Sequence, residues 1–296
     1  MVNILISGYY GFDNIGDESI LRTLVSSLRE HIPDCSLTVL SHNPASTREK
    51  YGVEAVDRMS PMAILRAVKK CDMLISGGGS LLQDVTSSKS LHYYLSIIRC
   101  AEFFHKKVFI YSQGIGPIDR PGNRRAAAAA LKRADGIVVR DERSAALLEE
   151  IGIARDKVVI TADPVIRMKK PDGDVGAEIL RKAGVSLDGR LTVGWAIRER
   201  DTDSRFVKEL LRSIQMMKDK YNAQSVLIPF HYEEDGEVCR HIAAQLPDDT
   251  AVCLNEKYLS EDMLSIIGNM DLLVGVRLHS LIYAAIMGVP LIGISY

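Results

Sequence analysis

The stretch that decides the fold reads Asp271-Leu-Leu-Val-Gly-Val-Arg277-Leu-His279-Ser280-Leu-Ile-Tyr-Ala-Ala-Ile-Met-Gly-Val-Pro290. Residues 272–276 have the unbroken apolar character of a buried parallel strand, and residues 280–287 form a short apolar helix closed by a glycine. Arg277 and His279 therefore lie at a strand-to-helix turn. In an open α/β sheet this turn lies at the ligand-binding edge, and the helix start offers N–H groups to an anion. We expect Arg277 to bind a phosphate or carboxylate, and the alternative is that it caps a neighbouring helix.

Short β-rich runs alternate with helical patterns along the chain, which predicts parallel sheets built from βα units. Strands are expected at residues 2–7, 37–40, 73–76, 108–112, 137–139 and 158–161, and again at 191–196, 225–229, 251–254, 272–276 and 291–294. The charged segment 169–174 separates the two series. We therefore predict an α/β fold of two Rossmann-like domains, residues 1–168 and 176–296, that face each other across a cleft.

The last predicted strand, residues 291–294, is followed by only Ser295 and Tyr296. Natural sheets usually cover such an edge, so we expect the second domain to be incomplete at its C-terminal end.

Composition and charge exclude several kinds of partner. The chain has 296 residues, 47% of them hydrophobic and 25% charged, and a formal net charge of -1. It therefore has no basic field that would attract nucleic acid. Five scattered cysteines without C-x-x-C spacing indicate reduced thiols and a cytoplasmic protein. The apolar start is too short for a signal peptide, and charges interrupt the apolar run near the C-terminus, so we expect no membrane span.

The first predicted βα loop reads Gly8-Tyr9-Tyr10-Gly11-Phe12-Asp13-Asn14-Ile15-Gly16-Asp17-Glu18. Its glycines let the backbone approach a ligand, and Asp17 or Ser19 can cap the helix expected over residues 19–30. The rings of Tyr9, Tyr10 and Phe12 are suited to stack on a sugar ring, while Asp13 and Asn14 can hydrogen-bond its hydroxyls. The alternative is a glycine-rich loop that serves only a tight turn.

A second loop, Ser76-Gly77-Gly78-Gly79-Ser80, places three glycines between a predicted strand and a helix, which favours an anion site. Arg140 leaves its strand as Arg277 does in the other half of the chain. Two arginines on opposite sides of a cleft would hold a small molecule with two anionic groups. The alternative for Arg140 is an ion pair with Asp141 or Glu142.

Other polar loops are weaker candidates for lining the cleft or binding a metal. Residues 194–201 and 229–235 each follow a predicted strand and are candidates to line the same cleft. The D-x-D pairs at 172–174 and 201–203 match a metal-binding spacing, but the first lies in the linker and the second can cap a helix. We therefore predict no metal site. We expect the remaining histidines to be structural or on the surface: His31, His42, His92, His105 and His241.

Taken together, the motifs resemble the polysaccharide pyruvyl transferase family over nearly the whole chain. They are Gly8-Tyr-Tyr-Gly11 with Asn14 and Gly16-Asp-Glu18, Gly77-Gly-Gly-Ser80-Leu-Leu-Gln83-Asp84, Gln113-Gly-Ile-Gly116-Pro117, Arg140-Asp141, Asp163-Pro164 and Arg277-Leu278-His279-Ser280. The similarity is strongest to the bacterial enzymes that pyruvylate a secondary cell-wall polymer used in S-layer anchoring.

This resemblance implies a GT-B-like fold, phosphoenolpyruvate as donor, and an N-acetylmannosamine residue of a lipid-linked precursor as acceptor. The product would be a 4,6-linked pyruvyl ketal. Arg277, Leu278, His279, Ser280 and Arg140 would bind the donor, with His279 as the proton donor and Arg140 and Asp13 also catalytic. The acceptor would meet Tyr9, Tyr10, Asp13, Asn14, Gly78 and Gly79. Family members continue beyond Tyr296 with Asp-Pro-Lys, where the lysine would also face the donor.

This chemistry requires no metal or redox cofactor. A lipid-linked acceptor implies that the enzyme works at the inner face of the membrane. Both a monomer and a homo-oligomer are compatible with the sequence. Two other functions remain as alternatives. A nucleotide-sugar glycosyltransferase of similar fold would need a base-binding pocket, and Trp195 is the only tryptophan. A sugar- or anion-binding module without catalysis would make His279 dispensable.

Overall fold

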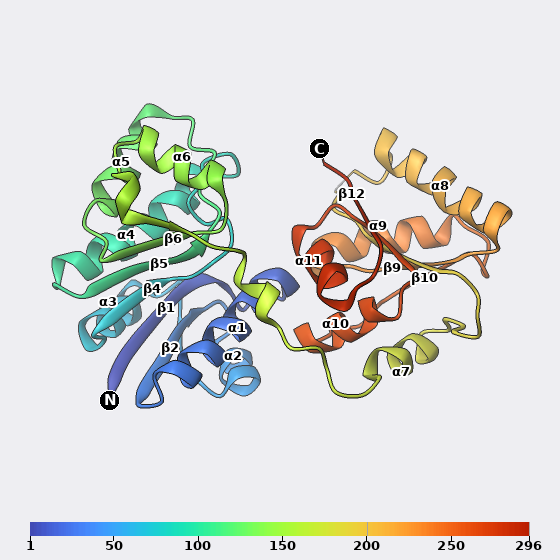
Figure 1. Ribbon diagram of the computed structural model, residues 1–296, viewed down its shortest axis with the longest axis horizontal. Helices are drawn as coiled ribbons and strands as arrows, with labels where there is room; N and C mark the ends of the chain where they lie inside the picture. The colour runs from blue at the N-terminus through green and yellow to red at the C-terminus, as the bar shows by residue number, and fades with distance from the viewer. Residues whose placement is uncertain (200, 296) are drawn as a thin grey trace. The chain divides into compact units, whose positions relative to one another are not determined.

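The computed structural model describes residues 1–199 and 201–295, and it divides the chain into two compact units. Unit 1 contains Met1–Phe12 and Asp17–Arg167, whereas unit 2 contains the chain from Met168 onward together with Asp13–Gly16 from the first loop. Each unit is a parallel sheet with helices on both faces (Figure 1).

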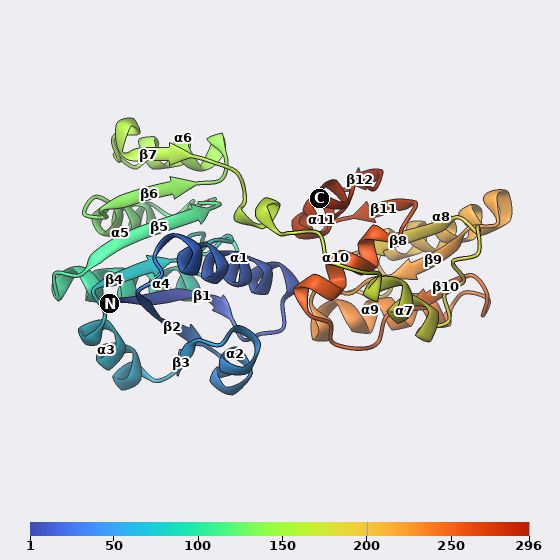
Figure 2. The same cartoon turned by 60° about the horizontal axis from the view of Figure 1, so that its bottom comes forward.

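Unit 1 carries the first seven strands and the helices between them. Its elements are β1 (Val2–Tyr10), α1 (Ile15–His31), β2 (Cys35–Ser41), α2 (Pro44–Tyr51), β3 (Glu54–Asp57), α3 (Pro61–Lys70), β4 (Met73–Ser76), α4 (Ser88–Phe103), β5 (Lys107–Gln113), α5 (Pro121–Leu131), β6 (Gly136–Val139), α6 (Glu142–Glu150) and β7 (Val158–Ile160). The sheet order is β3-β2-β1-β4-β5-β6-β7, which Figure 2 shows nearly edge-on. Neighbouring strands are parallel throughout this sheet.

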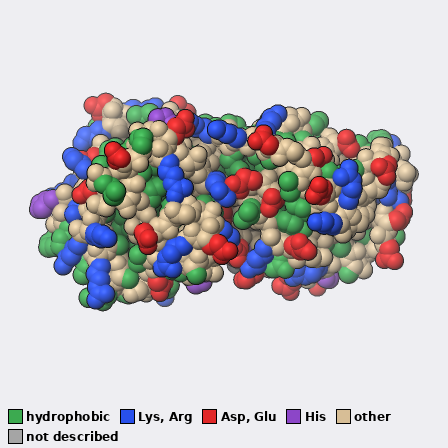
Figure 3. Space-filling model, turned by 90° about the horizontal axis from the view of Figure 1, so that it is seen from below, with side chains coloured by type: hydrophobic (Ala, Val, Ile, Leu, Met, Phe, Trp, Pro, Cys, Tyr) green, Lys and Arg blue, Asp and Glu red, His purple; other side chains and the backbone are tan. Residues whose placement is uncertain are grey.

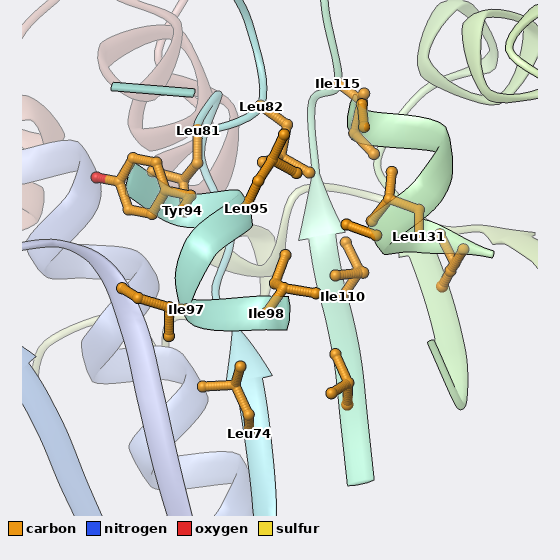
Figure 4. Packing of buried hydrophobic residues seen from close by; sticks show 14 of the residues in the cluster. Leu74, Leu81, Leu82, Tyr94, Leu95, Ile97, Ile98, Ile110, Ile115 and Leu131 are labelled. Atoms are coloured by element: carbon orange, nitrogen blue, oxygen red, sulfur yellow. The ribbon is translucent and has the colours of Figure 1, made fainter. Parts of the chain in front are cut away.

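Alternate residues of the central strands enter two different cores in unit 1. Ile4 and Ile6 pack with side chains of α1 and α2, whereas Leu5 packs on the opposite face with side chains of α3 to α6. Figure 4 shows this second core, where Leu74 of β4 and Ile110 of β5 meet the apolar side of α4. Burial on both faces explains the continuous apolar runs of these strands.

Unit 2 repeats the same construction on a smaller scale. Its elements are α7 (Val175–Lys182), β8 (Thr192–Ala196), α8 (Arg205–Tyr221), β9 (Gln224–Leu227), α9 (Tyr232–Ala244), β10 (Ala251–Cys253), α10 (Ser260–Gly268), β11 (Leu272–Gly275), α11 (Leu278–Met287) and β12 (Leu291–Gly293). The parallel sheet has the order β10-β9-β8-β11-β12. Trp195 is buried in its core, and the indole N–H donates to Ser225.

The predicted parallel α/β organisation is confirmed, and every predicted strand is present within a few residues. Strand β3 was missed because its four residues, Glu-Ala-Val-Asp, carry little apolar signal. Helix α1 begins at Ile15, so Asp17 and Ser19 lie inside its first turns and the prediction that they cap it was wrong. The facing arrangement of two domains and their limits at 168 and 176 remain predictions.

Each sheet has one point where the strand order reverses, between β1 and β4 in unit 1 and between β8 and β11 in unit 2. In open α/β sheets, the loops after the two strands at such a point diverge to opposite faces, and ligands bind in the crevice between them at the carboxyl edge. The first loop, the triple-glycine loop and the Arg277–His279 turn all follow strands at these two points.

On the face shown in Figure 3, acidic and basic side chains are interspersed, in keeping with the near-zero net charge. Among the described residues, no helix is long and apolar enough to cross a membrane.

Candidate active site

The turn between β11 and α11 carries the predicted anion site of unit 2. Arg277 occupies the N-cap position in an extended conformation, and Leu278 and His279 are the first residues of α11. The first N–H groups of a helix have no partner within it and carry partial positive charge, so this turn can receive an anion. Its position after β11, at the strand-order reversal, agrees with the prediction from the sequence.

Ser280 supports this turn and does not present its side chain to a ligand. It is completely buried, and its hydroxyl donates to the carbonyl of Arg277 at 2.6 Å. Its backbone N–H donates to the same carbonyl at 3.0 Å. The hydroxyl of Ser280 therefore closes the first turn of α11, and the donor-binding role of this residue stays a prediction.

Arg277 makes a two-point ion pair with Asp235 of α9. Its Nε lies 3.1 Å from Oδ2 and its Nη2 lies 2.5 Å from Oδ1 of a carboxylate that is 1% exposed. Oδ2 also accepts the backbone N–H of His231 at 2.9 Å. This partner was not predicted, because 42 residues separate it from Arg277. The pair fixes the guanidinium plane and leaves further N–H donors for a ligand.

The tetrapeptide Asp13–Gly16 lies against the same part of unit 2. The N–H of Ile15 donates to the carbonyl of Phe230 at 2.9 Å, and Asn14 forms an antiparallel bridge with His231. The carboxylate of Asp13 accepts from Lys257 Nζ at 2.7 Å. Gly16 meets the ring of His279: a Cβ built on this glycine would lie 2.2 Å from Nδ1. Asp13 and Asn14, predicted to bind the acceptor, thus lie in the same part of unit 2 as His279, predicted to bind the donor.

The other residues of the first loop are organised by Arg58, which the sequence analysis missed. Arg58 is 7% exposed, donates to the carbonyl of Gly8 at 2.9 Å, and lies over the rings of Tyr9, Phe12, Tyr93 and Tyr94. Phe12 stacks on Tyr9 and on His42, with centroid distances of 4.1 and 4.3 Å. A row of parallel rings therefore stands at the carboxyl edge of unit 1, with exposed His42 as a member.

Tyr10 differs from Tyr9 because β1 continues through both residues and sends their side chains to opposite faces. Tyr10 is completely buried, and burial raises the pKa of its hydroxyl well above the ordinary value. Its ring fills the space that side chains at Gly8 and Gly77 would need. The prediction that Tyr10 stacks on a sugar is therefore wrong, and the residue belongs to the core.

The triple-glycine loop is packed inside unit 1. Gly78 and Gly79 are buried, and Gly79 has a φ of 94°, a conformation that favours glycine. A Cβ on Gly79 would lie 2.9 Å from a carboxylate oxygen of Asp17. Because α4 begins only at Ser88, this loop does not lead directly into a helix, and the helix-start reason for an anion site there was wrong. The loop holds β1, β4 and α1 close together.

Arg140 has partners on two other segments of unit 1. Its Nη1 donates to Asp163 at 2.9 Å and its Nη2 donates to Ser80 at 2.9 Å, whereas Asp141 lies 3.8 Å from Nε. A Cβ at Gly114 would meet the guanidinium at 2.7 Å. The ion-pair interpretation named the wrong principal partner: Asp141 instead caps α6 by accepting from the N–H of Ser144. Arg140 and Asp163 bring three of the sequence motifs into contact.

The weaker candidates from the sequence have structural roles or lie outside the residues that the structure describes. Asp174 caps α7, and His231 caps α9 by accepting from the N–H of Glu234. Arg200, part of a loop expected to line the cleft, lies outside the described residues, as does Tyr296. Among the described residues, no cluster of three or more His, Cys, Asp or Glu side chains has an arrangement that would hold a metal ion.

Similar solved structures define the class of protein as GT-B-like. The structure of Anabaena Alr3699/HepE in complex with UDP-glucose has a TM-score of 0.64 at 11% identity, covering 99% of this chain and 80% of that one. A putative UDP-N-acetylglucosamine 2-epimerase from Listeria monocytogenes gives 0.68 at 10% identity, covering 98% and 78%. The E. coli ADP-heptose LPS heptosyltransferase II gives 0.55 at 14% identity, covering 99% and 84%. At such low sequence identities, the structural similarity establishes only the fold.

The sequence assigns the family. The polysaccharide pyruvyl transferase family model matches residues 14–296, so the chain belongs to the polysaccharide pyruvyl transferase family. The amylovoran biosynthesis protein AmsJ of Erwinia amylovora is 21% identical over 100% of this chain and 83% of that protein. The resemblance found in the motifs is thereby confirmed, and the family implies a transferase enzyme.

Proposed function

We propose that this protein transfers the enolpyruvyl unit of phosphoenolpyruvate to a sugar and closes it into a pyruvyl ketal. The observation that carries the proposal is the β11–α11 turn, where Arg277, His279 and a helix N-terminus lie together at the strand-order reversal of unit 2. Phosphoenolpyruvate has a carboxylate and a phosphate on three carbons. A guanidinium fork and helix N–H groups are suited to both anions.

In the proposed reaction, His279 protonates the methylene carbon of the donor and creates an oxocarbenium-like centre at the neighbouring carbon. One sugar hydroxyl attacks that carbon and loses its proton. The carbon–oxygen bond to phosphate then breaks, and a second hydroxyl of the same sugar attacks and loses its proton. One of the two released protons restores His279 and the other leaves with inorganic phosphate, so the reaction is balanced without an oxidant or reductant.

The proposed acceptor is an N-acetylmannosamine residue of a lipid-linked cell-wall polymer precursor, joined through its 4- and 6-hydroxyls. Tyr9, with its stacked neighbours, offers an apolar ring surface, and Asp13 and Asn14 offer short polar groups. Tyr10 is removed from the proposed acceptor set because it is buried, while the backbone of Gly78 and Gly79 stays in the proposed set. The same proposal places the enzyme at the inner face of the membrane and makes its product part of the polymer that anchors the S-layer.

Nucleotide-sugar transfer is the competing function, and a binding experiment separates the two. Thermal melting of the protein with phosphoenolpyruvate should show stabilisation that increases with ligand concentration. UDP-glucose at equal concentrations should leave the melting temperature unchanged. Stabilisation by UDP-glucose, with none by phosphoenolpyruvate, would replace the proposed donor. The Arg277→Ala variant provides the control, since its response to phosphoenolpyruvate should be lost.

The role of Asp13 can be read from the kinetics of Asp13→Asn with varied acceptor. If the carboxylate takes a proton from an attacking hydroxyl, turnover falls with little change in acceptor KM, and we expect this outcome with a loss of about tenfold or more. If Asp13 only binds the sugar, acceptor KM rises while kcat stays constant. Unchanged values of both would remove Asp13 from the active site.

We expect Arg140→Ala to lower stability and to raise the donor KM. The substitution leaves Asp163, which is 9% exposed, without its guanidinium partner, at a cost of about 1–3 kcal/mol. Thermal melting and donor kinetics, measured on the same preparation, check the two effects. A lower melting temperature with donor KM unchanged would show that Arg140 only ties Ser80 to Asp163, and that the donor is bound by unit 2.

A further inference from the structure

We propose that Gly16 and Lys257 are positioning residues that set the orientation of the His279 imidazole, acting through the tetrapeptide Asp13–Gly16. This inference rests on the proposed function, in which His279 delivers the proton. It assigns a role to Gly16, the first residue of the Gly16-Asp17-Glu18 motif.

The contact between Gly16 and His279 leaves no room for a side chain. A Cβ on Gly16 would lie 2.2 Å from Nδ1 and 2.8 Å from both Cε1 and Cγ of the imidazole, far inside van der Waals contact. Gly16 does not have a positive φ, so the backbone conformation alone would accept alanine. Glycine is therefore needed here because the imidazole ring packs directly on its α-carbon.

The tetrapeptide is fixed to the start of α9 by backbone contacts. Ile15 donates to the carbonyl of Phe230, and Asn14 bridges to His231. His231 in turn donates its N–H to Asp235, the carboxylate that orients Arg277. The segment that carries Gly16 and the carboxylate that holds Arg277 thus share one support. A shift of this support would move both proposed donor-binding side chains.

Lys257 secures the other end of the tetrapeptide. Its ammonium lies 2.7 Å from Asp13 and 5.2 Å from the ring centre of Tyr232, whose hydroxyl donates to the carbonyl of Asn255. The hydrogen bond to Asp13 raises the pKa of Lys257. Asp13 has a φ of 54°, a left-handed conformation that is unfavourable for a residue with a side chain. An ion pair at this residue helps hold the bend that carries Gly16, three residues away, toward His279.

The first test compares Gly16→Ala with Gly122→Ala, whose added Cβ would have no neighbour within 4 Å. We expect Gly16→Ala to lower kcat by about tenfold or more, since small displacements of a catalytic group are costly. It should also change the ¹⁵N NMR signals of the His279 ring and the pH profile of kcat. Gly122→Ala should match the parent protein. Unchanged ring signals and kcat in Gly16→Ala would overturn the proposal.

The second test uses Lys257→Met, Lys257→Arg and the control Lys220→Met. Lys220 also lies over a tyrosine ring, at 5.3 Å, but on the surface of α8. We expect Lys257→Met to lower kcat by about fivefold with donor KM nearly unchanged, and Lys257→Arg to restore most of it. A rise in donor KM with constant kcat would show that Lys257 binds the donor directly and would overturn the positioning role.

The proposed function and the positioning role can be refuted separately. If the parent protein transfers nothing from phosphoenolpyruvate, the proposed function fails, while the NMR signals of His279 in Gly16→Ala still test the contact. If the parent protein is active and His279→Ala is not, normal activity and normal ring signals in Gly16→Ala remove only the positioning role.

Discussion

Replacing His279 with alanine is expected to lower turnover by about a hundredfold or more, because general acid catalysis contributes roughly 10²–10⁴ to rate. The substitution removes the proposed proton donor and leaves open space beside Gly16, against which the imidazole packs. His279 is only partly buried, so the fold should persist. Initial rates with phosphoenolpyruvate, together with thermal melting, measure both effects.

A matched control for this variant is His92→Ala, which changes an exposed histidine on α4 of unit 1. It should retain the rate of the parent protein. If His279→Ala keeps turnover within about threefold of the parent, general acid catalysis by this residue is excluded. The binding-module alternative would then gain support, provided that the anion still binds.

The second large effect is expected from Arg277→Ala, which should raise the donor KM by about ten- to hundredfold, as loss of a charge-assisted two-point contact costs roughly 1.5–3 kcal/mol. Arg277→Lys should recover only part of this loss, because an ammonium cannot form the planar fork. Donor saturation curves for the two variants provide the measurement. A donor KM unchanged in both would move the donor away from the β11–α11 turn.

The same substitution has a structural cost that must be separated from binding. Arg277→Ala leaves the Asp235 carboxylate buried without its guanidinium, and such losses are strongly destabilising. Asp235→Asn keeps the size of that side chain but weakens the hold on Arg277. We expect it to raise donor KM less than Arg277→Ala does. Kinetics should be measured well below the melting temperature of each variant.

The fold and the position of the β11–α11 turn could be predicted from the sequence because their signals are local. The apolar run of β11, the helix of α11 and the arginine between them are continuous in the chain, and the parallel pairing of strands follows from βα alternation. Even the family could be recognised from short motifs, since these motifs lie in or next to the segments that follow strands. Local patterns were insufficient for the very short strand β3 and for the ends of some elements, such as the end of β1 and the start of α1.

Side-chain partners were not predictable in the same way, because they depend on contacts between distant segments. Nothing in the neighbourhood of Arg277 identifies Asp235, and nothing near Asp13 identifies Lys257, which is 244 residues away. Tyr10 was misjudged because the strand was expected to end at residue 7, and its continuation to Tyr10 turns that ring into the core. Arg58 belongs to no recognisable motif. Its contacts with four aromatic rings exist only in the folded protein, because the rings come from separate segments of the chain.

The most direct test of the central claim is analysis of the products formed from phosphoenolpyruvate and a synthetic lipid-linked disaccharide that ends in N-acetylmannosamine. The account predicts that the acceptor gains the mass of one pyruvyl ketal and that one inorganic phosphate is released for each ketal formed. His279→Ala should form neither product at a comparable rate. An acceptor of unchanged mass after incubation with active-site residues intact, or phosphate release without ketal formation, would contradict the account.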